Sequence, residues 1–204
     1  MKIAIIVGGK FHAFNLAQQL ESANCLSQII TSYPSSSLKE YGIFKPKINS
    51  IIIKEILMKF FSKFSFIETF FNYEDFLCEM FAKKASKLIN LKDVDVIIGW
   101  SSFSKETFIK SKNLNCIKVL ERGSSHIQFQ EKVLRKKYEK INLKPKLPSK
   151  KIIERELIEY ELADFISVPS EFVKKTFIEY GINENKIIKT PYGVNLNEFN
   201  FENV

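Results

Sequence analysis

Short apolar runs alternate with longer, partly polar segments along most of the chain. Every residue of the run 3–7 is apolar, and Gly8-Gly9 closes it. Such runs are typical of strands buried on both faces. Further strands are predicted at 26–31, 94–98, 116–120, 164–168 and 187–190, with helices at 13–20, 151–162 and after Ser170. Strands that alternate with helices pair in parallel, so we predict one α/β domain with a Rossmann-like, doubly wound parallel sheet.

The pattern between residues 48 and 81 is less regular. Residues 48–53 fit either a short strand or the start of a helix, and the sequence leaves both open. From Ile53 to Phe71 the apolar residues recur at spacings of three and four, with lysines among the polar positions, which predicts an amphipathic helix. A break follows near Asn72. We favour packing of the phenylalanine stripe on the sheet, and the alternative is contact with an anionic membrane.

Composition narrows the class of protein. The chain has 204 residues and a formal net charge of +8. It has no run long enough to cross a membrane and no signal-peptide pattern at its start. Cys25, Cys78 and Cys116 lie far apart, which predicts buried free thiols and neither a disulfide nor a metal framework. We therefore expect a cytoplasmic protein that uses no metal, with peripheral contact at the inner face of the membrane as an option.

The positive charge is concentrated in one segment after the middle of the chain. Its basic residues are Lys132, Arg135, Lys136, Lys137, Lys140, Lys144, Lys146, Lys150 and Lys151. A nucleic-acid interface would place exposed aromatic side chains between such residues. Here the aromatic residues belong to apolar stripes, so we expect no nucleic-acid partner.

Candidate chemistry lies in the loops after the predicted strands, because open α/β sheets bind ligands beyond the carboxyl ends of their strands. Gly8 and Gly9 would let backbone approach a phosphate closely. The pattern G-x-G-x-x-G and the G-x-x-x-x-G-K-[ST] loop are both missing, which argues against dinucleotide and ATP sites. The other candidates in these loops are His12, Trp100, Ser101, Arg122, Ser124, His126 and Ser170.

Residues 121–126 carry the densest set of polar candidates. Arg122 can pair with a phosphate or carboxylate, and Ser124 supplies a hydroxyl. His126 can donate a hydrogen bond to charge that develops on a substrate oxygen. The alternative is a surface loop with Arg122 in an ordinary salt bridge. The acidic run Glu154, Glu156, Glu159 and Glu161 is interpreted as the charged face of a helix.

These loops, the segment from Ala163 to Ser170 and the turn Pro191-Tyr192-Gly193 resemble the N-terminal domain of family-4 retaining glycosyltransferases, which have the two-domain GT-B fold. The resemblance implies that Gly8 and Gly9 lie against the donor phosphates. It also implies that His126 faces the reacting sugar and acts in catalysis. His12, Trp100, Ser101, Arg122, Ser124 and Ser170 would then line the acceptor side or the cleft.

The resemblance further implies that one domain binds the acceptor and another domain binds the donor. Residues 1–199 would form the acceptor-side half of the enzyme, and residues 200–204 would begin the interdomain linker. The donor-binding domain, with its Glu-x7-Glu pair, would then be supplied in cis or in trans. The implied reaction moves a sugar from a nucleotide sugar, the substrate, to a sugar or lipid-linked acceptor, with retention and without a cofactor. The rival hypothesis is a non-catalytic Rossmann-like module that recruits a partner or senses a nucleotide.

Overall fold

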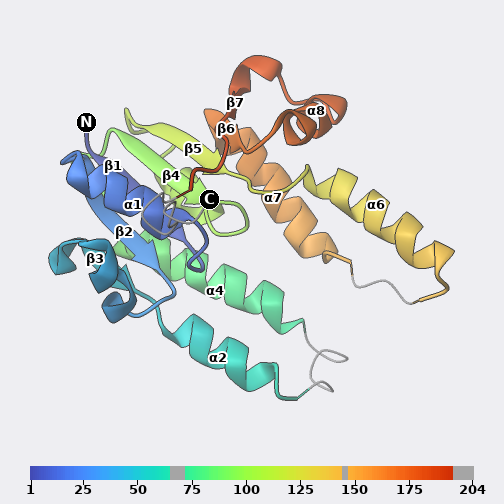
Figure 1. The fold of residues 1–204 in the computed structure, drawn as a ribbon, viewed down its shortest axis with the longest axis horizontal. Coiled ribbons are helices and arrows are strands. Elements are labelled where there is room, and N and C mark those ends of the chain that lie inside the picture. The colour runs from blue at the N-terminus through green and yellow to red at the C-terminus, as the bar shows by residue number, and fades with distance from the viewer. Residues whose placement is uncertain (65–71, 144–146, 195–204) are drawn as a thin grey trace, which may run out of the picture.

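The structure is a computed structural model that describes residues 1–64, 72–143 and 147–194. In this part of the chain, seven strands form one parallel sheet in the order β3-β2-β1-β4-β5-β6-β7 (Figure 1). The strands are β1 (Ile3–Val7), β2 (Leu26–Thr31), β3 (Ile48–Ser50), β4 (Val96–Trp100), β5 (Ile117–Glu121), β6 (Phe165–Val168) and β7 (Ile187–Lys189). The predicted Rossmann-like, doubly wound sheet is confirmed.

Helices cover both faces of this sheet. They are α1 (Ala13–Ser22), α2 (Ile53–Phe61), α4 (Tyr73–Leu88), α5 (Lys105–Lys110), α6 (Ile127–Lys140), α7 (Lys150–Leu162) and α8 (Glu171–Glu179), with 3-10 turns at Ser35–Tyr41, Lys45–Lys47 and Glu184–Lys186. Alternate residues of β1 face opposite cores: Ala4 and Ile6 pack with α4, α5, α7 and α8, whereas Ile5 and Val7 pack with α1. This arrangement explains why the whole of β1 is apolar. Among the described residues, no helix combines the length and apolar character needed to span a membrane.

The observed boundaries settle the open points of the sequence. The segment 48–53 contains both predicted alternatives, since β3 ends at Ser50 and α2 begins at Ile53. Strand β4 extends through Gly99 to Trp100, beyond the expected end at Ile98, because Trp100 pairs with Glu121 of β5. Ser170 caps α8 as predicted, with its hydroxyl accepting a hydrogen bond from the backbone of Val173. The expected linker at residues 200–204 lies outside the described residues.

Helix α2 does not bury the stripe that its sequence suggests. Ile56 is 57% exposed and Phe60 is 52% exposed, whereas Lys54 is buried. The Lys54 ammonium pairs with the Glu55 carboxylate at 2.8 Å and lies over the ring of Phe103. The expectation that the phenylalanine stripe packs on the sheet is therefore corrected for the described residues 53–64.

The acidic residues of α7 also differ from expectation. Glu156 and Glu159 are buried and do not belong to a solvated face, although Glu154 and Glu161 are exposed. The Glu159 carboxylate accepts hydrogen bonds from the backbone N–H groups of Ser102, Ser104 and Lys105. It thereby caps the N-terminus of α5, where the N-cap Ser104 makes no side-chain cap of its own.

Residue Ser102 is held at three points by the same helix. Its backbone φ is +73°, a left-handed conformation that is rare for residues other than glycine. Its N–H donates to Glu159, its hydroxyl donates to Glu156 at 2.6 Å, and its carbonyl accepts from Arg155 at 2.6 Å. Such a conformation persists only where the surrounding contacts fix it. Helix α7 therefore sets the shape of the loop 101–105.

Truncating the cap should destabilise the domain. We expect Glu159→Ala to lower the free energy of unfolding by about 2–4 kcal/mol, because one buried and two partly buried N–H groups lose their acceptor. Glu159→Gln should cost less, because its amide oxygen still accepts hydrogen bonds. Glu161→Ala, on the exposed face of α7, is the matched control and should change stability by no more than about 0.5 kcal/mol. Urea unfolding measures all three, and equal losses for Glu159→Ala and Glu161→Ala would contradict the capping role.

Candidate functional site

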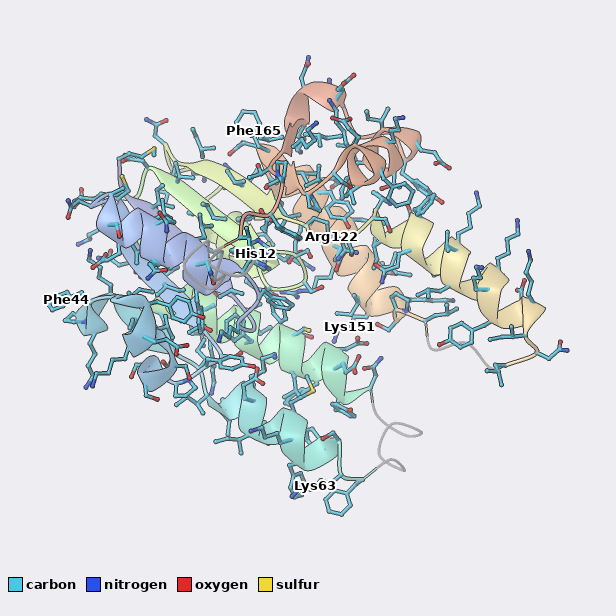
Figure 2. All side chains as sticks on the ribbon, in the orientation of Figure 1. His12, Phe44, Lys63, Arg122, Lys151 and Phe165 are labelled. Carbon is cyan, nitrogen blue, oxygen red and sulfur yellow. The ribbon has the colours of Figure 1, made fainter. Side chains whose placement is uncertain are left out.

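A cavity of about 380 Å³ opens where the strand order reverses direction, beside the carboxyl ends of β1, β4 and β5. Ligands of open α/β sheets bind at such a switch point. The cavity is lined by Phe11, His12, Trp100, Ser101, Ser102, Phe103, Arg122, Gly123, Ser124 and Tyr192. Five of the sequence-predicted residues therefore come together here: His12, Trp100, Ser101, Arg122 and Ser124. Figure 2 places the labelled His12 and Arg122 side chains in the same central region of the fold.

His12 is the histidine of the cavity. It stands at the start of α1, directly after the loop that follows β1. Its Nε2 lies 3.3 Å from Oε1 of Glu121, at the end of β5, and the Glu121 side chain is only 9% exposed. The centroid of the imidazole ring lies 5.1 Å from the ring centroid of Trp100 and 4.5 Å from that of Tyr192. A histidine with a carboxylate partner and partial exposure can exchange protons with a bound ligand.

Arg122 also lines the cavity, but its guanidinium is already fully engaged. A guanidinium has five N–H donors. Here they make five hydrogen bonds, two of them to the carbonyl oxygen of Ser125 and one each to Ser101, Glu156 and Gln130. The bond to Glu156 is a buried ion pair of 2.9 Å. Arg122 therefore fixes the loops around the cavity. Of the two expected partners, a phosphate or a carboxylate, the structure shows a carboxylate, and its burial corrects the alternative of a surface salt bridge.

Two helices begin at the edge of the sheet where the cavity opens, and the N-cap of α1, His12, lines the cavity. Helix α1 begins directly after His12, and α6 begins directly after His126. Both helices follow strands whose carboxyl ends border the cavity, so the positive ends of their dipoles lie at this edge of the sheet. Such ends favour anionic groups such as phosphates. Because Glu156 compensates the charge of Arg122, the helix N-termini are the sources of positive potential considered at this edge of the sheet.

The glycines and Ser170 lie near the cavity without lining it. A Cβ at Gly8 would come within 2.3 Å of the Phe103 ring, so the absence of a side chain lets Phe103 pack against the loop. Gly9 accepts a hydrogen bond from Thr31 through its carbonyl oxygen. Ser170 is occupied in capping α8. Close approach of Gly8 and Gly9 to a donor phosphate stays a prediction.

His126 lies outside the cavity. It is 1% exposed, its ring stacks on Tyr180 at 4.7 Å, and Tyr160 and Phe177 contact its other sides. Its Nδ1 accepts a hydrogen bond from the backbone of Gln128, which makes it the N-cap of α6. This arrangement gives His126 a structural task and no exposed face. The sequence predicted that both histidines face the cleft, and of the two only His12 lines the cavity.

Tyr192 was missed as a cavity residue, although the turn that holds it was recognised. A Cβ on Gly123 would lie 2.4 Å from the Tyr192 hydroxyl oxygen, so this glycine makes room for the tyrosine. Tyr192 follows β7, four strands away from β1 in the sheet. No sequence spacing relates it to His12, and only the return of the chain after β7 brings them together.

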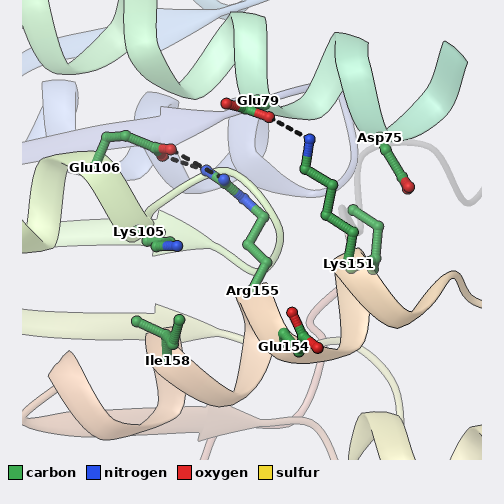
Figure 3. Close-up of a pocket in the computed structure, with 9 residues that line it drawn as sticks. Asp75, Glu79, Lys105, Glu106, Lys151, Glu154, Arg155 and Ile158 are labelled. Carbon is green, nitrogen blue, oxygen red and sulfur yellow. Dashed lines mark hydrogen bonds and ion pairs between the residues drawn. The ribbon is translucent and has the colours of Figure 1, made fainter.

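A second cavity, of about 230 Å³, lies between α4, α5 and α7 (Figure 3). Its central charges pair with each other, Arg155 with Glu106 and Lys151 with Glu79. Hydrogen bonds from Lys151 and Lys83 lower the pKa of Glu79 to about 2. These pairs leave the first cavity as the candidate site. Within the described residues, no group of three His, Cys, Asp or Glu side chains is arranged to hold a metal ion.

The buried His126 generates a pH dependence of stability. Burial, together with the nearby Arg122 charge, lowers the pKa of His126 from 6.5 to about 4. Because the unfolded chain binds this proton more readily, the contribution is complete above pH 6.5 and is lost as the pH falls from 6.5 to 4. The loss should approach about 3 kcal/mol, since each pKa unit corresponds to about 1.4 kcal/mol.

His126→Asn tests this assignment, because asparagine keeps an N-cap acceptor and does not titrate. The variant should be less stable at neutral pH, since it leaves a space among three aromatic rings. Its free energy of unfolding should nevertheless fall less steeply between pH 6.5 and 4 than that of the wild type. Urea unfolding across this range measures the slope, and identical slopes would show that His126 is not responsible.

Comparisons with known proteins support the fold. No protein-family model matches the chain, and no curated protein matches it. Among solved structures, similar folds include the UDP-GlcNAc 2-epimerase from Methanocaldococcus jannaschii in complex with UDP-GlcNAc and UDP, with a TM-score of 0.56 and 15% identity over 93% of this chain and 46% of that one. S. aureus MnaA with UDP has a TM-score of 0.55 and 14% identity over 93% and 44%. The UDP-N-acetylglucosamine 2-epimerase from Rickettsia bellii has a TM-score of 0.53 and 12% identity over 94% and 44%.

These identities establish the fold and not the activity. The chain spans about half the length of the structures it matches. It has the α/β Rossmann-like fold found in one half of GT-B-type nucleotide-sugar enzymes.

Proposed function

We propose that this chain is the acceptor-side domain of a GT-B glycosyltransferase, which moves a sugar from a nucleotide sugar to an acceptor hydroxyl in glycan or glycolipid synthesis. The observation that carries the proposal is the pair His12 and Glu121 in a cavity at the switch point of the sheet. The family-4 resemblance of the loops and of the Pro191-Tyr192-Gly193 turn supports the same reaction, with retention of configuration.

The cavity provides the groups that such an acceptor needs. His12 can accept a hydrogen bond from the acceptor hydroxyl and share its proton, while Glu121 orients the imidazole. The ring of Tyr192, which is 51% exposed, offers an apolar face on which a sugar ring can stack, while the buried Trp100 supports the imidazole of His12. The N-termini of α1 and α6 favour the donor phosphates. Nucleoside diphosphate leaves with the electron pair of the broken C–O bond, and the new C–O bond forms to the acceptor oxygen.

The donor would be held mainly by a second domain, in cis or in trans. GT-B enzymes bind the nucleotide between two Rossmann-like domains, and this chain corresponds to about half of the structures it resembles. We therefore propose that residues 1–199 contribute the acceptor side and that nucleotide affinity of this part alone is low. A sugar or lipid-linked molecule is the proposed acceptor.

A second candidate function is epimerisation of a nucleotide sugar. It is favoured by the fold of the neighbours, several of which are UDP-GlcNAc 2-epimerases. The two reactions differ in a measurable way, because an epimerase changes its substrate without any acceptor. A non-catalytic module that senses a nucleotide would bind one and release it unchanged.

The first test is isothermal titration of the chain with UDP-, GDP- and ADP-sugars, followed by product analysis with the donor-binding domain added. Half of a two-domain site should bind these ligands with a Kd above about 1 mM, and the combined halves should transfer sugar. Tight binding by the chain alone would contradict the half-site proposal. Conversion of UDP-GlcNAc to an epimer without acceptor would establish the second candidate instead.

The role of His12 is tested by His12→Asn in the same combined assay. We expect at least a 100-fold loss of kcat, in the range of general acid–base contributions, with little change in nucleotide affinity. His126→Asn, checked for folding at neutral pH, is the comparison variant and should retain most of the activity. If His126→Asn abolishes transfer and His12→Asn does not, the sequence-based assignment of His126 holds and ours fails.

A further inference from the structure

The segment 52–64 presents an apolar surface that the fold leaves in contact with solvent. Its exposed large side chains are Ile52 at 39%, Ile53 at 37%, Ile56 at 57%, Phe60 at 52% and Phe64 at 39%. We refer to these five residues as the α2 patch. They recur at spacings of three and four from Ile53 to Phe64, so they follow one side of α2 and the turn after it.

In this segment, two positively charged side chains are exposed, whereas the negatively charged one is engaged in contacts. Lys59 and Lys63 are exposed, and they are the fully exposed charges of residues 52–64. Glu55 is only partly exposed, and its carboxylate is engaged by Lys54 at 2.8 Å and by the Ser32 hydroxyl at 2.6 Å. The surface that solvent meets is therefore apolar and positive.

The inward side of α2 combines the buried Lys54 with the partly buried Leu57, Met58 and Phe61. A helix that packs on a sheet buries isoleucine and phenylalanine and exposes lysine. Helix α2 instead buries Lys54 beneath its own surface, with the ammonium 5.7 Å from the centre of the Phe103 ring. The ion pair Lys54–Glu55 and the hydrogen bond from Ser32 anchor the polar side of the helix inward. The outward direction of the α2 patch is thus fixed by specific contacts.

We propose that the α2 patch docks on the surface of a bilayer that contains anionic phospholipid. Exposed apolar side chains that lie beside exposed lysines match the boundary between acyl chains and anionic headgroups. The lysines would contact phosphates while Ile56 and Phe60 enter the apolar layer. The positive charge of Lys59 and Lys63 argues against an uncharged protein partner. The apolar side chains of the α2 patch argue against a ligand that binds through charge alone.

The position of α2 gives this contact a consequence for the site. Helix α2 begins three residues after β3, whose carboxyl end belongs to the same edge of the sheet as the cavity. In Figure 1 it runs alongside α4 and away from the sheet, and the labelled Lys63 lies at its far end in Figure 2. Docking through α2 would bring the cavity close to a membrane-bound acceptor. The docking proposal itself does not depend on the proposed reaction, because vesicle binding requires no sugar substrate.

Vesicle flotation at low salt tests the proposal with the chain as it exists. The wild type should float with vesicles that contain phosphatidylglycerol and much less with pure phosphatidylcholine vesicles. Ile56→Ser combined with Phe60→Ser should reduce the bound fraction at least about ten-fold, because the apolar part of the contact is lost. The control is Phe172→Ser on α8, which removes a phenylalanine that is 62% exposed, more than the 52% of Phe60, and should leave binding unchanged.

A second pair of variants separates local charge from overall charge. Lys59→Gln with Lys63→Gln should weaken binding at least about ten-fold at low salt, since each lysine near the surface contributes to the attraction. Lys132→Gln with Lys136→Gln, on the exposed side of α6, changes net charge equally and should have a much smaller effect. Equal losses for the two pairs would overturn the α2 patch as the docking site. Absence of flotation would also overturn the proposal. A dimer detected by light scattering, and disrupted only by the Ile56→Ser, Phe60→Ser variant, would overturn it as well, because a second copy of the chain would then cover the α2 patch.

Discussion

The buried contact between α7 and the loop 101–105 supports every part of the candidate site. Three backbone N–H groups converge on Glu159, and Glu156 holds both Arg122 and the Ser102 hydroxyl. Burial and the neighbouring Glu156 carboxylate raise the pKa of Glu159 to about 7, which shows that placing two acids here is unfavourable in itself. The cost is offset by donors from the loop and by two arginines. In return, the loop keeps a left-handed residue in a fixed position.

This constraint determines which residues remain available for chemistry. Arg122 is drawn into the buried network and becomes a support, with all its donors used. His126 is enclosed by aromatic rings and caps α6. His12 and Tyr192 keep exposed surface in the cavity, with Glu121 behind the imidazole. The proposed chemistry is therefore carried by a few side chains that packed loops hold in place.

The same principle applies to α2, on a different surface. There the contact of Lys54 with Glu55 and Phe103 holds the helix with its polar side inward. Phe103 also packs against the loop at Gly8 and lines the cavity. The same aromatic side chain therefore contacts both α2 and the cavity. The pairing of Lys54 with Glu55 offsets the cost of burying its charge beside the partly buried Leu57 and Phe61. The α2 patch and the cavity are thus two outcomes of one set of packed contacts.

The sequence by itself determined the fold class, the alternation of strands and helices along most of the chain, and half of the residues that line the cavity. Apolar runs of strand length and their alternation with helices are local properties, and the loops after parallel strands must gather at one edge of the sheet. His12, Trp100, Ser101, Arg122 and Ser124 were therefore found without the structure. Only the tertiary structure decided which of the two histidines faces the cavity, that Glu156 and Glu159 are buried, and that α2 turns its isoleucines and phenylalanines outward. Each of these outcomes depends on a partner far away in the sequence, such as Thr176 for the backbone of His126 or Ser102 for Glu159, and periodicity within one helix does not encode where that partner lies.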